Sequence, residues 1–124
     1  MANILVVDDS TVMRRGLSLI LTKAGHTVVG QATNGEQAFL LYSRIKPDLV
    51  TMDITMPTMD GIDAMKSILK NFPDAKIVVI SSLDQKKTIL EAVELGAKHY
   101  IVKPFKDAKV LTIINEVLQE KKIG

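Results

Sequence analysis

The sequence predicts an α/β fold, in which helices cover both faces of a five-stranded parallel sheet. Five short apolar segments alternate with five amphipathic helical patterns along the chain. Each connection between strands therefore contains a helix, as parallel strands require. The apolar segments are nearly continuous, which is typical of strands buried on both faces. A length of 124 residues suits one domain, and we expect residues 1–124 to form it.

The first strand is expected over residues 4–7, which are all apolar. Asp9 or Ser10 can cap the helix that follows, and Gly25 can end it in the left-handed conformation. The apolar positions of this helix recur at helical spacing, at Met13, Leu17, Ile20 and Leu21. A second strand is then expected over residues 27–32.

The second helix should begin after Asn34, a good N-cap residue, and end before Pro47. Its inner face would carry Ala38, Leu41 and Ile45. The third strand is expected over residues 49–52, and the turn-rich loop 55–61 leads from it into a third helix that Pro73 ends. The inner face of this helix would carry Ile62, Met65, Ile68 and Leu69.

The fourth strand is expected over residues 77–80, and residues 82–85 have the pattern of a capping box for the next helix. The apolar positions of that helix are Ile89, Ala92, Val93 and Leu95, and Gly96 stands at its C-terminal turn. The last strand is expected over residues 100–102. The fifth helix should extend from residue 107 to about residue 121, with an apolar face of Val110, Ile113, Ile114, Val117 and Leu118.

The composition of the chain argues against several functional classes. The net charge of +2 comes from lysines scattered among acids, and Trp is absent, so we expect no nucleic-acid interface. Without Cys, thiol chemistry and Cys-based zinc sites are excluded. The sequence has no apolar stretch of membrane-spanning length and no signal-peptide pattern. We therefore expect a cytoplasmic protein with no membrane insertion.

Four of the predicted strands are each followed directly by residues suited to phosphoryl chemistry. These residues are Asp8 and Asp9, Asp53, Ser81 and Lys103. In open α/β sheets, ligands bind at the carboxyl ends of the strands, so these side chains should share one edge. Each has a structural explanation when taken alone; Asp9, for example, could simply cap a helix. Their joint placement favours a functional site.

The chemistry of these residue types indicates a metal-dependent phosphate site. Clustered carboxylates repel one another and favour a cation, and hard oxygen ligands without His or Cys suit Mg²⁺ or Mn²⁺. Asp8 and Asp9 would hold or support the metal, and Asp53 could be a ligand or a nucleophile that accepts a phosphoryl group. Lys103 would supply a fixed cation, and Ser81 could donate to a phosphoryl oxygen.

Three separated motifs fit one known family. They are the acidic pair within residues 6–10, the strand end and loop of residues 52–57 with 60–61, and the lysine signature of residues 102–105. In this order they resemble the receiver domain of two-component response regulators, over the whole chain. The resemblance implies a flavodoxin-like, doubly wound sheet with strand order 2-1-3-4-5.

The resemblance also implies a role for each site residue. Asp53 would be the phosphoacceptor, and Asp8, Asp9, Asp53 and the backbone carbonyl of Thr55 would arrange Mg²⁺ or Mn²⁺. Lys103 and Ser81 would contact the phosphoryl group, and the bond before Pro104 is expected to be cis. Ser81 and Tyr100 would move together and switch the face formed by the fourth helix, fifth strand and fifth helix.

The same resemblance implies the partners. A sensor histidine kinase, such as a chemotaxis kinase, would supply the phosphoryl group, and a phosphatase could remove it. The motif around Asp53 and the chain end soon after the fifth helix look most like stand-alone chemotaxis receivers, which are monomers that bind the flagellar motor switch. Such a protein is a signalling switch that catalyses its own phosphoryl transfer and dephosphorylation, without turnover of an external substrate.

Three alternatives stay open at this stage. The chain could be a phosphorelay intermediate, or a receiver detached from a DNA-binding regulator. From a different class, it could be a small phosphohydrolase with an Asp nucleophile. That enzyme would need a general acid two residues after the nucleophile, where this chain has Thr55.

Overall fold

The computed structural model describes residues 1–56 and 59–120 of the chain. Five parallel strands form one sheet in the order β2-β1-β3-β4-β5, as the resemblance implied. The strands are β1 (Asn3–Val7), β2 (Thr27–Ala32), β3 (Leu49–Asp53), β4 (Ile77–Ser82) and β5 (His99–Lys103). The helices are α1 (Thr11–Lys23), α2 (Gly35–Ile45), α3 (Gly61–Asn71), α4 (Lys86–Leu95) and α5 (Asp107–Leu118).

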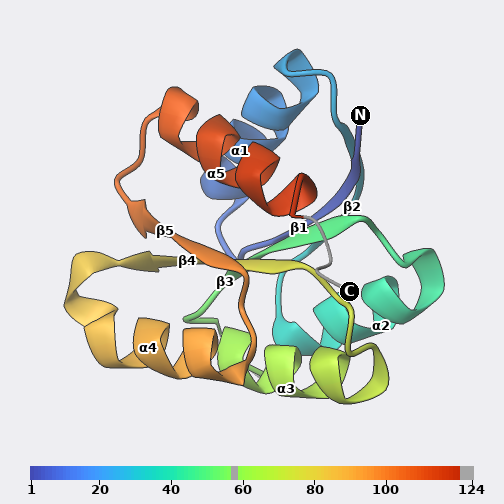
Figure 1. Ribbon diagram of the computed structural model, residues 1–124, viewed down its shortest axis with the longest axis vertical. Helices are drawn as coiled ribbons and strands as arrows, with labels where there is room; N and C mark the ends of the chain where they lie inside the picture. The colour runs from blue at the N-terminus through green and yellow to red at the C-terminus, as the bar shows by residue number, and fades with distance from the viewer. Residues whose placement is uncertain (57–58, 121–124) are drawn as a thin grey trace.

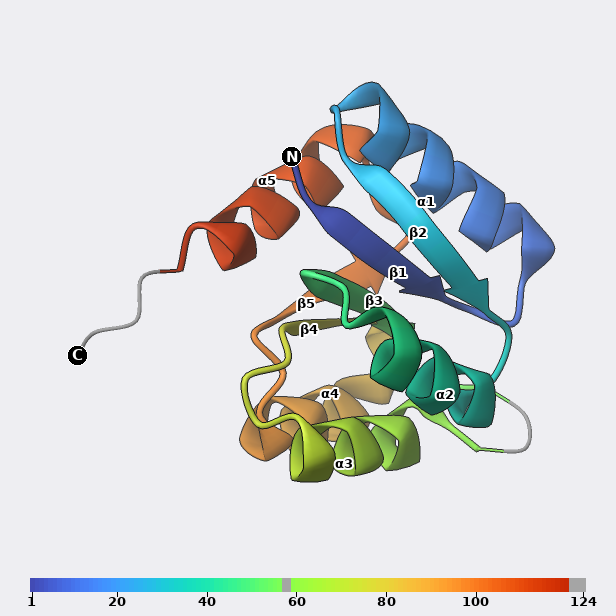
Figure 2. The same cartoon turned by 90° about the vertical axis from the view of Figure 1, so that its right-hand side faces the viewer.

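The sheet lies between two helical layers, with α1 and α5 on one face and α2, α3 and α4 on the other (Figures 1 and 2). The alternation of side chains along each strand divides the core between these layers. Ile4 and Val6 of β1 pack with residues of α1 and α5, whereas Leu5 and Val7 pack with residues of α2, α3 and α4. The doubly wound fold predicted from the sequence is confirmed.

Side-chain caps determine where three of the helices begin. Ser10, and not Asp9, caps α1 by accepting the Met13 N–H at 3.2 Å. Asn34 caps α2 as predicted. Asp60 caps α3, a role that the sequence did not single out because this residue lies inside a turn-rich loop.

In the second half of the chain, one predicted helix start is confirmed and one helix end differs. Ser82 and Gln85 form the predicted capping box, which opens a short 3₁₀ turn, η1 (Leu83–Gln85), directly before α4. The helix α5 ends at Leu118, while the predicted end at residue 121 lies outside the described residues. Val117 is the last buried residue of α5, and Gln119 and Glu120, which follow the helix, are exposed.

The segment after β3 approaches its own strand so closely that it requires a glycine. The Gly61 N–H donates to the carbonyl of Ile54 at 2.8 Å. A Cβ atom at Gly61 would overlap the carbonyl oxygen of Asp53 and would lie 2.8 Å from the Cα of Ile54. Gly61 therefore lets α3 start directly against the end of β3. No helix in the described part of the chain is long and apolar enough to cross a membrane.

We predict that Gly61→Ala lowers the free energy of unfolding by about 1–3 kcal/mol, because the backbone of Asp53 and Ile54 must shift to admit the methyl group. Gly16→Ala is the matched control, since Gly16 is exposed within α1 and a Cβ there meets no atom within 4 Å. This control should raise stability by about 0.5–1 kcal/mol, the usual helix preference for Ala. Urea unfolding measures both values, and equal changes in the two variants would contradict the steric argument.

Candidate functional site

Strand alternation brings three of the predicted charged residues to one side of the sheet edge. Asp8 lies two residues beyond Val6, Asp53 two beyond Thr51, and Lys103 two beyond Ile101. Side chains two residues apart on a strand point to the same face of the sheet. Asp8, Asp53 and Lys103 therefore lie on the face that α1 and α5 cover. Because β1, β3, β4 and β5 are parallel and adjacent, their carboxyl ends meet at this edge.

The lysine lies between two buried carboxylates. Lys103 Nζ is 3.4 Å from Asp8 Oδ2 and 3.7 Å from Asp53 Oδ1. Asp8 is only 1% exposed and Asp53 only 5%. Asp9, by contrast, is exposed at the start of the following loop. The predicted meeting of Asp8, Asp53 and Lys103 is therefore observed, with Asp9 at the solvent side.

Hydrogen bonds around Asp8 fix the position of its carboxylate and backbone. The Ser10 N–H donates to Asp8 Oδ1 at 2.9 Å. Arg14 donates through Nη1 to the carbonyl oxygen of Asp8 at 2.8 Å, and through Nε to Gln31 on β2 at 3.2 Å. Arg14 was not among the site residues predicted from the sequence. Its position one helical turn after the cap Ser10 was the available signal, since that spacing points a long side chain back toward the helix start.

The pKa of the Asp53 carboxyl is raised to about 6, and burial is the largest cause. The negative charges of Asp8 and Asp9 contribute the rest of the rise. Lys103 and a hydrogen bond from the Thr55 backbone lower the same pKa, but they offset only part of the rise. Above about pH 6, the ionised Asp53 therefore carries an electrostatic cost that an added cation would reduce.

Three carboxylates are arranged so that they could share a metal ion. One oxygen from each of Asp8, Asp9 and Asp53 lies within 4.8 Å of the others. An all-oxygen donor set of this kind suits a hard divalent cation such as Mg²⁺. Burial and the charges of Asp8 and Asp9 raise the pKa of Asp53 despite Lys103, so an added cation would favour its ionised form. The residues present thus fit a divalent metal by donor chemistry and by charge.

Ser81 lies on the opposite face of the sheet from Asp8, Asp53 and Lys103. It is two residues beyond Val79, which packs toward α2, α3 and α4. Its hydroxyl donates to Gln85 Oε1 at 2.5 Å, and the residue is buried. Ser81 is thus near the edge that Asp53 occupies, but its hydrogen bond points toward the start of α4.

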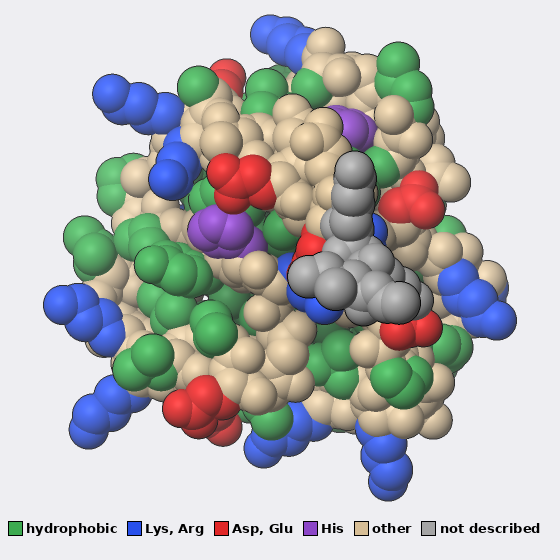
Figure 3. Space-filling view, viewed as in Figure 1, with side chains coloured by type: hydrophobic (Ala, Val, Ile, Leu, Met, Phe, Trp, Pro, Cys, Tyr) green, Lys and Arg blue, Asp and Glu red, His purple; other side chains and the backbone are tan. Residues whose placement is uncertain are grey.

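The remaining predicted residues lie on and beside β5. Tyr100 is 43% exposed, so its ring lies outward on the surface. The Lys103–Pro104 peptide bond is cis, as expected. Hydrophobic side chains gather on the left of the molecule, where β5 and α4 lie (Figure 3). The exposed apolar residues there are Leu83, Leu90, Val93 and Tyr100, and they flank an apolar groove.

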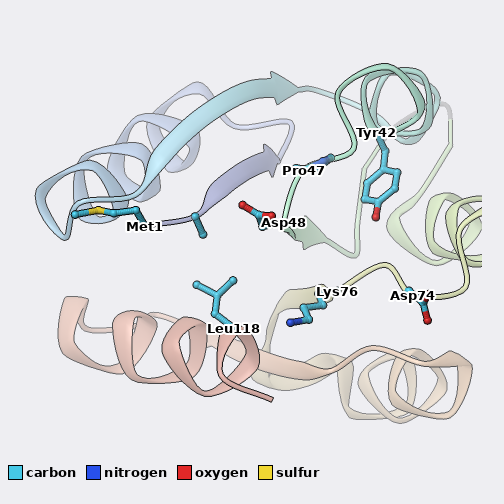
Figure 4. A pocket seen from close by; sticks show the side chains of 8 residues that line it. Met1, Tyr42, Pro47, Asp48, Asp74, Lys76 and Leu118 are labelled. Carbon is cyan, nitrogen blue, oxygen red and sulfur yellow. The ribbon is translucent and has the colours of Figure 1, made fainter. Parts of the chain in front are cut away.

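A second pocket, more polar than the groove beside α4 and β5, lies at the end of the sheet where the strands begin (Figure 4). Its lining includes Asp48 and Lys76, which directly precede β3 and β4. Asp48 Oδ2 already accepts the Asn3 N–H at 2.7 Å. The pocket is separated from Asp53 by the length of the strands, so it does not contribute to the carboxylate site.

Comparisons with known proteins agree with this geometry. The profile of the response regulator receiver domain matches residues 4–115. The chain is 52% identical to chemotaxis protein CheY of Thermotoga maritima over 114 residues, which cover 92% of this chain and 95% of that protein. It is 48% identical to chemotaxis protein CheY of Bacillus subtilis over 115 residues, covering 93% and 96%.

A solved complex of CheX with CheY, BeF₃ and Mg²⁺ from Borrelia burgdorferi contains a similar fold. The TM-score is 0.91 at 37% sequence identity, and the match covers 95% of this chain and 90% of that chain. That protein was therefore captured with a magnesium ion and a fluoride complex of beryllium. The two chains are therefore similar in sequence as well as in the arrangement of their strands and helices.

We predict that Asp53→Asn raises the free energy of unfolding in metal-free buffer by on the order of 3 kcal/mol at pH 7. The pKa of Asp53 is raised in the folded state, so the fold binds the proton more tightly than the unfolded chain does. Wild-type stability should therefore fall, relative to the variant, as the pH rises from about 4 through about 6. Urea unfolding at several pH values in the presence of a chelator measures this difference.

Asp63→Asn is the control for this prediction, because Asp63 is an exposed residue in the first turn of α3. Removing its charge should cost a little stability through the helix dipole. It should not reproduce the pH-dependent gain. A difference between wild type and Asp53→Asn that stays constant across this pH range would contradict the electrostatic account.

Proposed function

Because this chain belongs to the response regulator receiver domain family, we propose that it is a signalling switch phosphorylated on Asp53. The single observation that carries the proposal is the position of Asp53. This carboxylate is nearly buried, lies at the end of the central strand β3, and is 3.7 Å from the ammonium group of Lys103. A phosphoacceptor needs both an oxygen nucleophile and a nearby cation that stabilises the transferred group.

In the proposed reaction, an Asp53 carboxylate oxygen attacks the phosphorus of a phosphohistidine on a sensor histidine kinase. The new O–P bond forms as the P–N bond breaks, and the histidine ring leaves with its electron pair. The nucleophile must be ionised, and a pKa of about 6 leaves most of the Asp53 carboxyls ionised at neutral pH. The product is an acyl phosphate on Asp53.

Side chains around Asp53 would stabilise the transferred group. The Lys103 ammonium can pair with the carboxylate before the transfer and with a phosphoryl oxygen after it, because it already lies between Asp8 and Asp53. Asp8, Asp9, Asp53 and the carbonyl of Thr55 would hold Mg²⁺ or Mn²⁺. When bound, the ion supplies positive charge to the phosphoryl oxygens during transfer.

The response to phosphorylation would be a change at the face formed by α4, β5 and α5. Ser81 would turn its hydroxyl from Gln85 toward the phosphoryl group, and the exposed ring of Tyr100 would move inward. Phosphorylation would then favour one of two arrangements that exist beforehand. The exposed apolar residues beside Tyr100 supply a surface that a protein partner can read.

The similarity to two chemotaxis proteins CheY supports a role in chemotaxis. We therefore propose that residues 1–124 act as one domain, a cytoplasmic monomer that a chemotaxis kinase phosphorylates and that binds the flagellar motor switch. A phosphatase would return it to the resting state. A pull-down with phosphorylated and unphosphorylated protein tests the target: recovery of a histidine phosphotransfer domain in place of a motor protein would indicate a phosphorelay.

We predict that incubation with acetyl phosphate and Mg²⁺ adds one base-labile phosphoryl group to the wild-type chain, and that Asp53→Asn abolishes the adduct. Intact-mass measurement before and after alkaline treatment gives the result. Asp63→Asn should be phosphorylated like wild type, because its exposed carboxylate lies outside the site. An undiminished adduct in Asp53→Asn would overturn the assignment, and steady hydrolysis of varied phosphate esters would instead favour a phosphohydrolase.

A further inference from the structure

The side chain of Gln85 bonds to two segments of the site, the strand end that carries Ser81 and the loop that follows Asp53. Gln85 is the last residue of η1, just before α4. Its Oε1 accepts the Ser81 hydroxyl at 2.5 Å, and its Nε2 donates to the hydroxyl of Thr55. Thr55 belongs to the loop that follows Asp53, thirty residues earlier in the sequence. One amide thus connects the end of β4 to the loop beside the proposed phosphoacceptor.

The orientation of this amide is set by its surroundings. The backbone N–H of Ser82, which can only donate, points at Oε1 from 3.4 Å. Oε1 therefore belongs on the Ser81 and Ser82 side, and Nε2 faces Thr55. This contact between Ser82 and Gln85 is also one half of the predicted capping box, so the residue that helps start α4 holds the Ser81 hydroxyl as well.

We propose that Gln85 is a positioning residue that holds the receiver in its resting arrangement through Ser81. This inference rests on the proposed function, because the Ser81 hydroxyl has a second destination only if Asp53 carries a phosphoryl group. To reach that group, the hydroxyl must give up its bond to Gln85. The bonds of Gln85 therefore stabilise only the resting arrangement, and they set part of the cost of switching.

Removing the amide should make the switched arrangement easier to reach. Gln85→Ala should bind beryllofluoride, a phosphoryl mimic, about fivefold more tightly than wild type, since the bonds that oppose switching are lost. Its affinity for Mg²⁺ alone should be unchanged, because Asp8, Asp9 and Asp53 stay in place. A purely structural role in starting α4 would weaken beryllofluoride binding or leave it unaltered.

Two further variants test whether the effect passes through the observed contacts. Thr55→Val removes one partner of the amide and keeps the backbone carbonyl, so it should give a smaller gain in beryllofluoride affinity, and adding it to Gln85→Ala should give no further gain. In a Ser81→Ala background, Gln85→Ala should have no effect. The control Gln119→Ala removes an exposed amide just after α5 and should match wild type.

Titration of the full chain with beryllofluoride at saturating Mg²⁺, followed by amide NMR, measures these affinities. Tighter binding by Gln85→Ala that depends on Ser81 supports the proposal. Equal or weaker binding by Gln85→Ala, with normal binding by wild type, overturns the positioning role alone. Failure of the wild-type chain to bind beryllofluoride or to accept a phosphoryl group would overturn the proposed function, and this inference with it.

Discussion

The electrostatic imbalance at the carboxyl edge of the sheet is the constraint on which the rest of the site depends. Asp8 and Asp53 are nearly buried, Asp9 lies close by, and Lys103 is the cation that contacts both buried acids. Burial and the charges of the two neighbouring carboxylates raise the pKa of Asp53, and one lysine offsets only part of this rise. A bound divalent cation would lower this electrostatic cost, and it would then favour attachment of an anionic phosphoryl group. The charges that oppose folding would thus serve the proposed chemistry.

The fold maintains this imbalance through features that have little to do with charge. Strand alternation places Asp8, Asp53 and Lys103 in one layer, and the parallel sheet brings their strand ends together. Gly61 allows the loop after Asp53 to return against its own strand. Alternation also turns Ser81 toward α4, where Gln85 binds it. The proposed phosphoacceptor and its proposed sensor are thus on neighbouring strands, but their side chains bond on opposite faces of the sheet, an arrangement that suits a switch with two states.

The sequence predicted the strands, the helices and the meeting of the charged residues because these depend on local patterns. Apolar runs, caps such as Asn34 and the parallel-sheet rule were sufficient. The strand order and the cis bond before Pro104 came from the resemblance, since hydrophobic periodicity does not specify either. The spacing of Arg14 from Ser10 indicates the direction of its side chain, but the partners of Arg14 and Gln85 could not be predicted, because a long side chain can reach several groups and only the packed structure selects one.

The most direct test of this account is the titration of the Asp53 side-chain carboxyl, followed by carbon NMR with and without Mg²⁺. Without metal, the account predicts a pKa near 6. With saturating Mg²⁺, it predicts a pKa well below that value, because the cation stabilises the ionised carboxylate. A metal-free pKa at or below the ordinary value of 3.8, unchanged by Mg²⁺, would contradict both the charge imbalance and the metal site that follows from it.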